Sequence, residues 1–255
     1  MGGRWALLDH ELDCWATVGR VATFWWRDDD AVRCTPALDR LLALSRKMDV
    51  PIALAVIPSL ARRELSHCLG AYPHTRVLQH GYAHRNYAPA GMKATEFDLH
   101  RPRRRVIAEL LRGSERLNRL FPDQVLPILV PPWNRIDRAL LSELPRLGLS
   151  GLSTFRARDT TEAVPGLRQA NCHVDLIDWR HTGHFVGWDR ALGEVVAHLE
   201  ARRAEQVDPD EPTGLLTHHL DHDRECWHFL EAFLNRTQKH LAVHWLDARE
   251  AMWPA

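Results

Sequence analysis

Short apolar runs alternate with amphipathic stretches along most of the chain. Runs of four to seven mostly apolar residues predict strands at 21–26, 51–57, 76–79, 125–130, 151–155, 173–177, 214–217 and 241–246. Apolar residues at helical spacing predict helices at 36–47, 59–69, 102–121, 138–147, 190–203 and 225–235. Strand and helix therefore alternate about seven or eight times, which predicts a parallel sheet or a closed barrel.

The breaks between these elements agree with a single folding unit. Thr35 followed by Pro36 gives the next helix a capping hydroxyl and a proline in its first turn. The polar, acidic stretch 204–212 reads as a surface loop, and no linker rich in glycine or serine divides the chain. We expect one domain spanning residues 1–255.

Composition excludes several classes of protein. Lys plus Arg and Asp plus Glu both number 33, so no net charge attracts nucleic acid or an acidic membrane. The five cysteines are widely spaced and form no C-x-x-C pair, which favours reduced thiols over a disulfide framework or a zinc ribbon. The first 18 residues lack the pattern of a secretory signal, and no apolar run is long enough to cross a membrane. We expect a cytoplasmic protein whose partner is a small molecule or an oligosaccharide.

Polar residues collect where the predicted strands end. They are Asp28-Asp29-Asp30, His80, Pro131-Pro132-Trp133-Asn134, the group Asp175, Asp178 and Trp179, and His218-His219. In barrels and open α/β sheets, active sites form at the carboxyl ends of the strands. The sequence therefore predicts that these residues share one site.

The segment His80-Gly81-Tyr82-Ala83-His84 indicates the chemistry of that site. Two histidines four apart can place both imidazoles on one side of a helical turn. With a carboxylate from elsewhere they form a 2-His-1-carboxylate set, which leaves positions open for catalysis. A metalloprotease of the H-E-x-x-H kind is disfavoured because Gly81 occupies the second position and no glutamate lies between the histidines.

The order of these motifs resembles the polysaccharide deacetylases with a NodB homology domain, carbohydrate esterase family 4. The resemblance runs from about Val21 to Leu246. The five similar segments are Arg27-Asp28-Asp29-Asp30, His80 to His84, Val130-Pro131-Pro132-Trp133, Asp175 to Trp179, and Leu216-Thr217-His218. It implies a distorted (β/α)7 barrel and metal-dependent removal of an acyl group by hydrolysis of a carbon–nitrogen bond other than a peptide bond.

Two positions depart from the family pattern. Gly81 stands where serine or threonine is usual, and Val130 stands where an arginine normally pairs with the catalytic aspartate. Arg27 can supply that charge, because side chains alternate along a strand and Arg27 points to the same face as Asp29. We therefore expect Asp29 to be the base and Asp30 the metal ligand, with Asp28 as the alternative register.

The resemblance implies a role for each site residue. Asp30, His80 and His84 would hold a divalent metal, with Zn²⁺ first and Co²⁺ or Ni²⁺ also suited to imidazole. Asp29 would deprotonate the attacking water and His218 would protonate the leaving amine. Substrate-binding or supporting roles fall to Arg27, Asp28, Pro132, Trp133, Asp175, Asp178 and Trp179. His219, His222 and Asp223 receive no role.

The predicted function is a metal-dependent deacetylase that removes an N-acetyl group from a carbohydrate-type substrate. Two alternatives remain open. One is a cytoplasmic amidohydrolase acting on a small amide that is not a sugar. The other is a catalytically inactive NodB-like binding protein, which the Val130 departure motivates.

Overall fold

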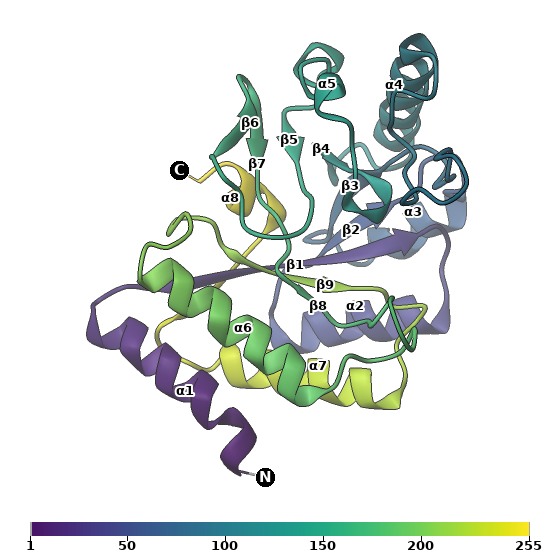
Figure 1. The fold of residues 1–255 in the computed structure, drawn as a ribbon. Helices are drawn as coiled ribbons and strands as arrows, with labels where there is room; N and C mark the ends of the chain where they lie inside the picture. The colour runs from purple at the N-terminus through teal and green to yellow at the C-terminus, as the bar shows by residue number, and fades with distance from the viewer. Residues whose placement is uncertain (1, 255) are drawn as a thin grey trace.

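The computed structural model describes residues 2–254 as a mixed α/β structure built on one sheet (Figure 1). The strands are β1 Ala22–Ala31, β2 Ala53–Val56, β3 Arg76–His80, β4 Val125–Val130, β5 Gly151–Leu152, β6 Glu162–Val164, β7 Leu167–Gln169, β8 Val174–Asp175, β9 Thr213–Thr217 and β10 Val243–Leu246. The α-helices are α1 Gly2–Thr17, α2 Pro36–Met48, α3 Arg63–Gly70, α4 Arg103–Leu120, α5 Arg138–Leu141, α6 Trp188–Arg203, α7 Arg224–Thr237 and α8 Ala248–Met252. Two short 3₁₀ turns, Pro132–Asn134 and Pro145–Leu147, complete the described elements.

Seven of the strands follow one another around a distorted barrel. The sheet order is β6-β7-β5-β4-β3-β2-β1-β9-β8, and all neighbours except β6 and β7 are parallel. Between β5 and β8 there is no ladder, only a single parallel bridge between Phe155 and Cys172. This bridge closes a ring of β1, β2, β3, β4, β5, β8 and β9. The parallel β/α arrangement expected from the alternating pattern is confirmed, and so is the distorted (β/α)7 barrel that the resemblance implied.

Strand β1 is central because it separates the two halves of the core. Phe24 and Trp26 point outward into a large cluster under the helices, whereas Trp25 points into the barrel with the small residues of β2. In Figure 1, α1, α6, α7 and α2 cover one side of β1 and β9. Each strand of the ring is thus buried on both faces, which explains its continuous apolar sequence.

Of the helices that the sequence predicts, one is clearly interrupted. Thr35 caps α2 as expected, since its Oγ1 accepts a hydrogen bond from the Leu38 N–H at 3.1 Å. The expected helix 138–147 is interrupted: α5 ends at Leu141, and a separate 3₁₀ turn begins at Pro145. Proline cannot donate a helical hydrogen bond, and its ring clashes with the preceding turn. No helix among residues 2–254 is long and apolar enough to span a bilayer.

Candidate metal centre and active site

The three aspartates that end β1 leave the strand in different directions. Asp29 faces the barrel interior together with Arg27, while Asp28 faces the helix layer and contacts His219. The pairing of β1 with β2 shifts register between Asp28 and Ala31, and Asp30 has a left-handed backbone with φ of 70°. Such irregularities re-aim side chains at strand ends. Here the carboxylate of Asp30 turns toward the histidines after β3.

Arg27 holds Asp29 with both arms of its guanidinium. Nε lies 2.9 Å from Asp29 Oδ1, and Nη2 lies 3.1 Å from Oδ2. Nη1 also donates to Ser153 Oγ at 2.7 Å, and Nη2 donates to Asn134 Oδ1 at 2.7 Å. Both side chains are almost fully buried, so the pair is a desolvated, bidentate ion pair with a fixed geometry. The charge missing at Val130 is therefore present beside Asp29, and it comes from β1 itself.

The two histidines do not share a helical turn, contrary to the expectation from their spacing. His80 ends β3, and His84 follows in an irregular turn with φ of 52°. The turn starts at Gly81, where φ is +57° and a Cβ would lie 2.1 Å from Glu96 Oε2. Glu96 is fully buried and accepts the N–H groups of Tyr82 at 3.0 Å and Ala83 at 2.8 Å. Glycine is needed there because Glu96 fills the space in which a side chain would stand.

Asp30, His80 and His84 bring three ligand atoms together. The Nε2 atoms of His80 and His84 lie 3.3 and 3.4 Å from Asp30 Oδ1. That oxygen is buried and has no hydrogen-bond partner. His80 Nδ1 donates to the Val130 carbonyl at 3.0 Å, which leaves the Nε2 lone pair facing Asp30. An unpartnered carboxylate oxygen between two imidazole nitrogens fits a first-row divalent cation.

The electrostatics of this group agree with a cation between the ligands. Burial raises the pKa of Asp30, but the close contact with His80 and the charges of His80 and His84 outweigh that effect and hold it well below its usual range. Burial lowers the pKa of His80, but Asp29 and Asp30 outweigh burial and raise it. The pKa of His84 is lowered by burial and then by His80. A divalent cation bound there would compete with protons for the Nε2 atoms of both rings.

The opposite wall of the site comes from β8 and β9. His218 follows β9, and its Nδ1 lies 3.8 Å from Asp175 Oδ1. The other Asp175 oxygen accepts the indole N–H of Trp179 at 2.9 Å, and the Trp179 ring stands edge-on to His218. Burial raises the pKa of Asp175 despite the opposing charge of His218. Trp133 packs against His84 from the β4 side, with ring centroids 4.4 Å apart.

These groups surround one cavity of about 220 Å³. Its lining residues are Asp29, Asp30, His80, His84, Trp133, Asn134, Arg135, Asp175, Trp179 and His218. Eight of the twelve residues expected from the sequence line the cavity; of the other four, Arg27 binds the lining residue Asp29 and Pro132 packs against Gly81. Strained backbone gathers here as well, since Asp30, His84, Trp133 and Asn134 all have positive φ.

Two expected supporting residues lie outside the cavity. Asp178 bonds the ring of His181 at 3.0 Å and lies 3.6 Å from Arg190 at the surface, so it does not reach His218. Asp28 faces away from the metal ligands, which disfavours the alternative register in which it would be base or ligand. Glu96 and Ser153 were not foreseen from the sequence, since neither follows a predicted strand with a polar motif. Asn134 was expected at this site because it follows Trp133 at a strand end, but its bond to Arg27 was not foreseen.

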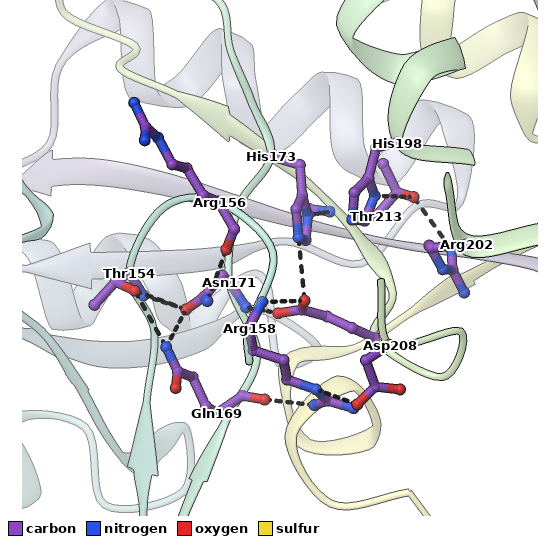
Figure 2. A network of polar contacts seen from close by, with 12 residues as sticks. Thr154, Arg156, Arg158, Gln169, Asn171, His173, His198, Arg202, Asp208 and Thr213 are labelled. Carbon is purple, nitrogen blue, oxygen red and sulfur yellow. Dashed lines mark hydrogen bonds and ion pairs between the residues drawn. The ribbon is translucent and has the colours of Figure 1, made fainter. Parts of the chain in front are cut away.

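A second group of possible ligands has a different character. His173, His198 and Glu211 bring three ligand atoms within 4.8 Å of one another beneath β9 (Figure 2). His173 Nδ1 accepts the N–H of Gly214 at 2.9 Å. Its proton must therefore sit on Nε2, which faces Glu211 Oε2 at 3.4 Å and has no lone pair for a metal.

The surroundings of this second group also oppose a cation. Burial, His173 and Arg202 together lower the pKa of His198 to about 2. Glu211 is fully buried and accepts the backbone N–H groups of Arg158 and Asn171 at 2.8 and 2.9 Å. The network in Figure 2 thus joins the segment after β5, the segment before β8 and α6 into one polar layer. We therefore interpret His173, His198 and Glu211 as part of a polar network that holds these segments together, and not as metal ligands.

Comparison with known proteins gives the fold its context. No protein-family model matches the chain, and no curated protein sequence matches it. A solved structure from Mycobacterium smegmatis, described as a polysaccharide deacetylase, superposes with a TM-score of 0.61 at 14 % identity, covering 92 % of this chain and 90 % of that one. A family 4 acetyl xylan esterase from Clostridium thermocellum, solved with a cobalt ion, gives 0.53 at 10 % identity, with 90 % and 89 % covered.

The similar structures include an inactive protein. A pseudoenzyme of carbohydrate esterase family 4 gives a TM-score of 0.56 at 12 % identity, covering 92 % of this chain and 68 % of that one. A fold shared by enzymes and a pseudoenzyme does not by itself assign an activity. Because these structures superpose over about nine-tenths of this chain, the resemblance seen in the sequence is confirmed at the level of the fold, which is the one that these polysaccharide deacetylase structures share.

Proposed function

We propose that this chain is a metal-dependent hydrolase that removes an acyl group, in the first place N-acetyl, from a carbohydrate-type substrate. The observation that carries the proposal is one cavity in which a 2-His-1-carboxylate set adjoins a carboxylate locked by arginine and faces a histidine. An inactive binding protein would have no need of this arrangement, since a desolvated base and three converging ligands are costly to keep.

The ligand set would hold the metal. Two imidazoles and one carboxylate suit Zn²⁺, and Co²⁺ and Ni²⁺ share the preference for imidazole. Bound by Asp30, His80 and His84, the ion would polarise the acyl carbonyl and lower the pKa of a water molecule toward about 7.

The chain's own residues would move the protons. Asp29 would accept the proton of the attacking water, with its carboxylate oriented by the two bonds from Arg27. His218 would donate a proton to the nitrogen of the leaving amine, and the Asp175 carboxylate lies 3.8 Å from its Nδ1. Asp175 is in turn fixed by the Trp179 indole and by the Ile177 N–H at 3.0 Å.

The proposed reaction also needs an N–H group that donates a hydrogen bond to the oxyanion. Several backbone amides in the loops after β3 and β4 are already engaged in other hydrogen bonds. The amides of Tyr82 and Ala83 already donate to Glu96, and that of Tyr87 donates to the Thr95 carbonyl. Pro132 has no N–H. Among the remaining amides of the two loops, we take that of Trp133, at the head of the strained turn beside His84, as the first candidate donor, with those of residues 84–86 as the alternatives.

The walls of the cavity suit a sugar ring. Trp133 and Trp179 both line it, and Trp179 is half exposed. Aromatic faces pack well against the apolar face of a sugar or an acyl methyl group. A volume of about 220 Å³ has room for an acyl group and little more than one ring. If the protein is cytoplasmic, as its sequence leads us to expect, the substrate is a soluble carbohydrate rather than a wall polymer.

The first test is metal content by elemental analysis. We expect about one Zn, Co or Ni per chain in the wild type and none in His80→Ala/His84→Ala. The matched control is His67→Ala/His244→Ala, which removes two exposed histidines far from the cavity and should leave the metal in place. Loss of metal in the control would mean that the metal binds nonspecifically.

The second part of the test is turnover on N-acetylated chito-oligosaccharides and a panel of small amides. His218→Ala should keep the metal and lose turnover at least a hundredfold. Turnover of amides but not of sugars would favour the small-amide alternative. No metal after reconstitution and no turnover would leave a non-catalytic barrel.

A further inference from the structure

Asp28 is a buried carboxylate on the wrong face of its strand for catalysis. It lies on the side of β1 that carries Phe24 and Trp26, under the helices, and it is 0 % exposed. Its Oδ1 contacts His219 Nδ1 at 2.5 Å, and its Oδ2 accepts the Thr217 hydroxyl at 2.7 Å and the His219 N–H at 3.0 Å. All of these partners come from the end of β9 and the residues that follow it.

Stability alone does not account for this pair. Burying a charge is costly, and a buried ion pair is often no more stable than apolar side chains of similar size. The outward positions before Asp28 on this strand are aromatic and well packed, so an apolar residue would suit this face. The charge is moreover supported by a chain of bonds, since the Trp26 indole donates to Thr217 Oγ1 at 2.9 Å. Such a network favours one geometry over its neighbours.

The pair lies where the backbone pairing of β1 and β9 stops. The ladder between the two strands runs from Phe24 opposite Thr213 to Asp28 opposite Thr217. Beyond that point the side chain of Asp28, rather than a backbone carbonyl, receives the N–H of His219. Asp29 and Asp30 follow Asp28 directly, and His218 directly precedes His219. The ends of the two strands that carry the base, one metal ligand and the acid are therefore tied together through this contact.

We infer that Asp28 and His219 are positioning residues, a clamp that sets Asp29 and Asp30 at the right distance from His218 across the cavity. The inference rests on the proposed function for the meaning of that distance. The clamp is kept for the geometry of the site rather than for the stability of the barrel. It acts through its neighbours, and neither residue lines the cavity.

The decisive variant replaces the whole clamp by apolar side chains, as Asp28→Leu/His219→Leu. No buried charge is left unpaired, but the Thr217 hydroxyl and the N–H of residue 219 lose their acceptor, so we expect a folded protein whose melting temperature is lowered by several degrees. With the tie removed, we expect kcat to fall at least tenfold at unchanged KM, and Co²⁺ to bind about tenfold more weakly. The measurements are thermal unfolding, steady-state kinetics and a Co²⁺ titration.

Two further variants keep the test decisive if the apolar pair does not fold. His219→Asn places an amide N–H near the position of Nδ1 and should retain kcat within about threefold. His219→Leu leaves Asp28 without that donor and should lose both stability and kcat. The control is His222→Phe in the same loop. The His222 ring packs on Trp227 and its nitrogens have no hydrogen-bond partner, so this variant should change neither the kinetics nor Co²⁺ binding.

The outcomes separate this inference from the proposed function. Wild-type kcat and wild-type Co²⁺ affinity in a folded apolar pair would overturn the clamp, as would an equal loss of kcat in His219→Asn and His219→Leu. A wild type that binds Co²⁺ but turns over no acyl substrate would contradict the proposed function, and the Co²⁺ affinities alone would then judge the clamp. A wild type that binds no Co²⁺ would overturn both.

Discussion

All three nitrogens of the Arg27 guanidinium donate hydrogen bonds inside the barrel. It makes five hydrogen bonds, two of them to Asp29 and the others to Asn134 Oδ1, Ser153 Oγ and the Thr154 carbonyl. A lysine at this position would be a point charge with three donors and no fixed fork, so it could not reproduce the bidentate contact. The geometry of Asp29 thus depends on the shape of this side chain as well as on its charge.

We therefore expect Arg27→Lys to lower kcat at least tenfold and to cost about 2 kcal/mol of stability, because a buried pair is weakened and several donors are lost. Urea unfolding and steady-state kinetics measure the two effects. The control is Arg116→Lys on α4, which loses bonds to the Pro58 and Ala61 carbonyls far from the cavity. It should lose stability and keep kcat. Equal kcat losses in both variants would mean that Arg27 acts only through stability.

Contacts within one strand could be predicted from the sequence, whereas contacts between distant segments could not. Alternation along one strand is enough to place Arg27 and Asp29 on the same face, since it needs no knowledge of neighbours. The partner of Asp28 could not be foreseen, because it depends on β9 lying beside β1, although the two segments are about 190 residues apart. Glu96 was missed for a similar reason. It sits in an irregular loop without periodicity, and only the folded turn brings it under Gly81.

At the scale of elements, long periodic segments were predicted well and short ones poorly. Strand β4 and helix α4 lie within one residue of their expected ends. The β6–β7 hairpin was missed because its strands have three residues each and carry little pattern. Helix α1 was overlooked although Leu8, Leu12 and Trp15, all fully buried, have helical spacing. The expected helix 138–147 failed at Pro145, whose effect outweighed the apolar spacing.

The packing of α6 on β9 makes stability depend on pH. His198 of α6 stacks on His173, with ring centroids 3.5 Å apart, and burial comes first among the causes that lower both pKa values. The folded state therefore holds both rings neutral, whereas the unfolded chain protonates them below about 6.5. Stability should be fully present above that pH and should fall as the pH drops below it, by up to about 1.4 kcal/mol per pH unit for each ring.

Urea unfolding at pH 7.5, 6.5, 5.5 and 5.0 tests this dependence. His198→Phe keeps the stacked ring but cannot be protonated, so its stability should vary less steeply over the same range. His67→Phe, at an exposed position on α3, serves as the control and should show the wild-type slope. Identical slopes in His198→Phe and the wild type would contradict the assignment.

For the whole molecule, the weakest place in the ring of strands is between β5 and β8. Only the bridge of Phe155 with Cys172 spans it, with hydrogen bonds of 3.0 and 2.8 Å to the backbone of Thr154 and Arg156. Asn171 reinforces the gap. Its side-chain oxygen accepts the Thr154 N–H at 2.8 Å, and its amide donates to the Arg156 carbonyl at 2.8 Å. The alternation of strands and helices predicted a parallel sheet or a barrel. It could not predict that β5 and β8 would be joined by a single bridge, because this depends on how short these two strands are.

Asn171→Ala should therefore loosen the ring at this place. Losing a side chain with several buried partners should cost about 1–3 kcal/mol. Hydrogen exchange should accelerate at residues 154–156 and 171–173 and remain slow in β2 and β3. The control, Asn118→Ala, removes an exposed amide that bonds only within α4. Uniformly faster exchange throughout the barrel would mean that the whole sheet, rather than this one junction, had been weakened.

The thin junction has a consequence for ligand binding. Trp133 follows β4 on one side of it, and Trp179 follows β8 on the other. A molecule that contacts both indoles would link the segments that follow β4 and β8, and would thereby hold the two sides of the β5–β8 junction together. Occupancy should then raise the melting temperature and slow exchange at 154–156 and 171–173 at once. A screen for thermal stabilisation, followed by hydrogen exchange at these amides, would identify a ligand of the cavity even if the protein does not hydrolyse it.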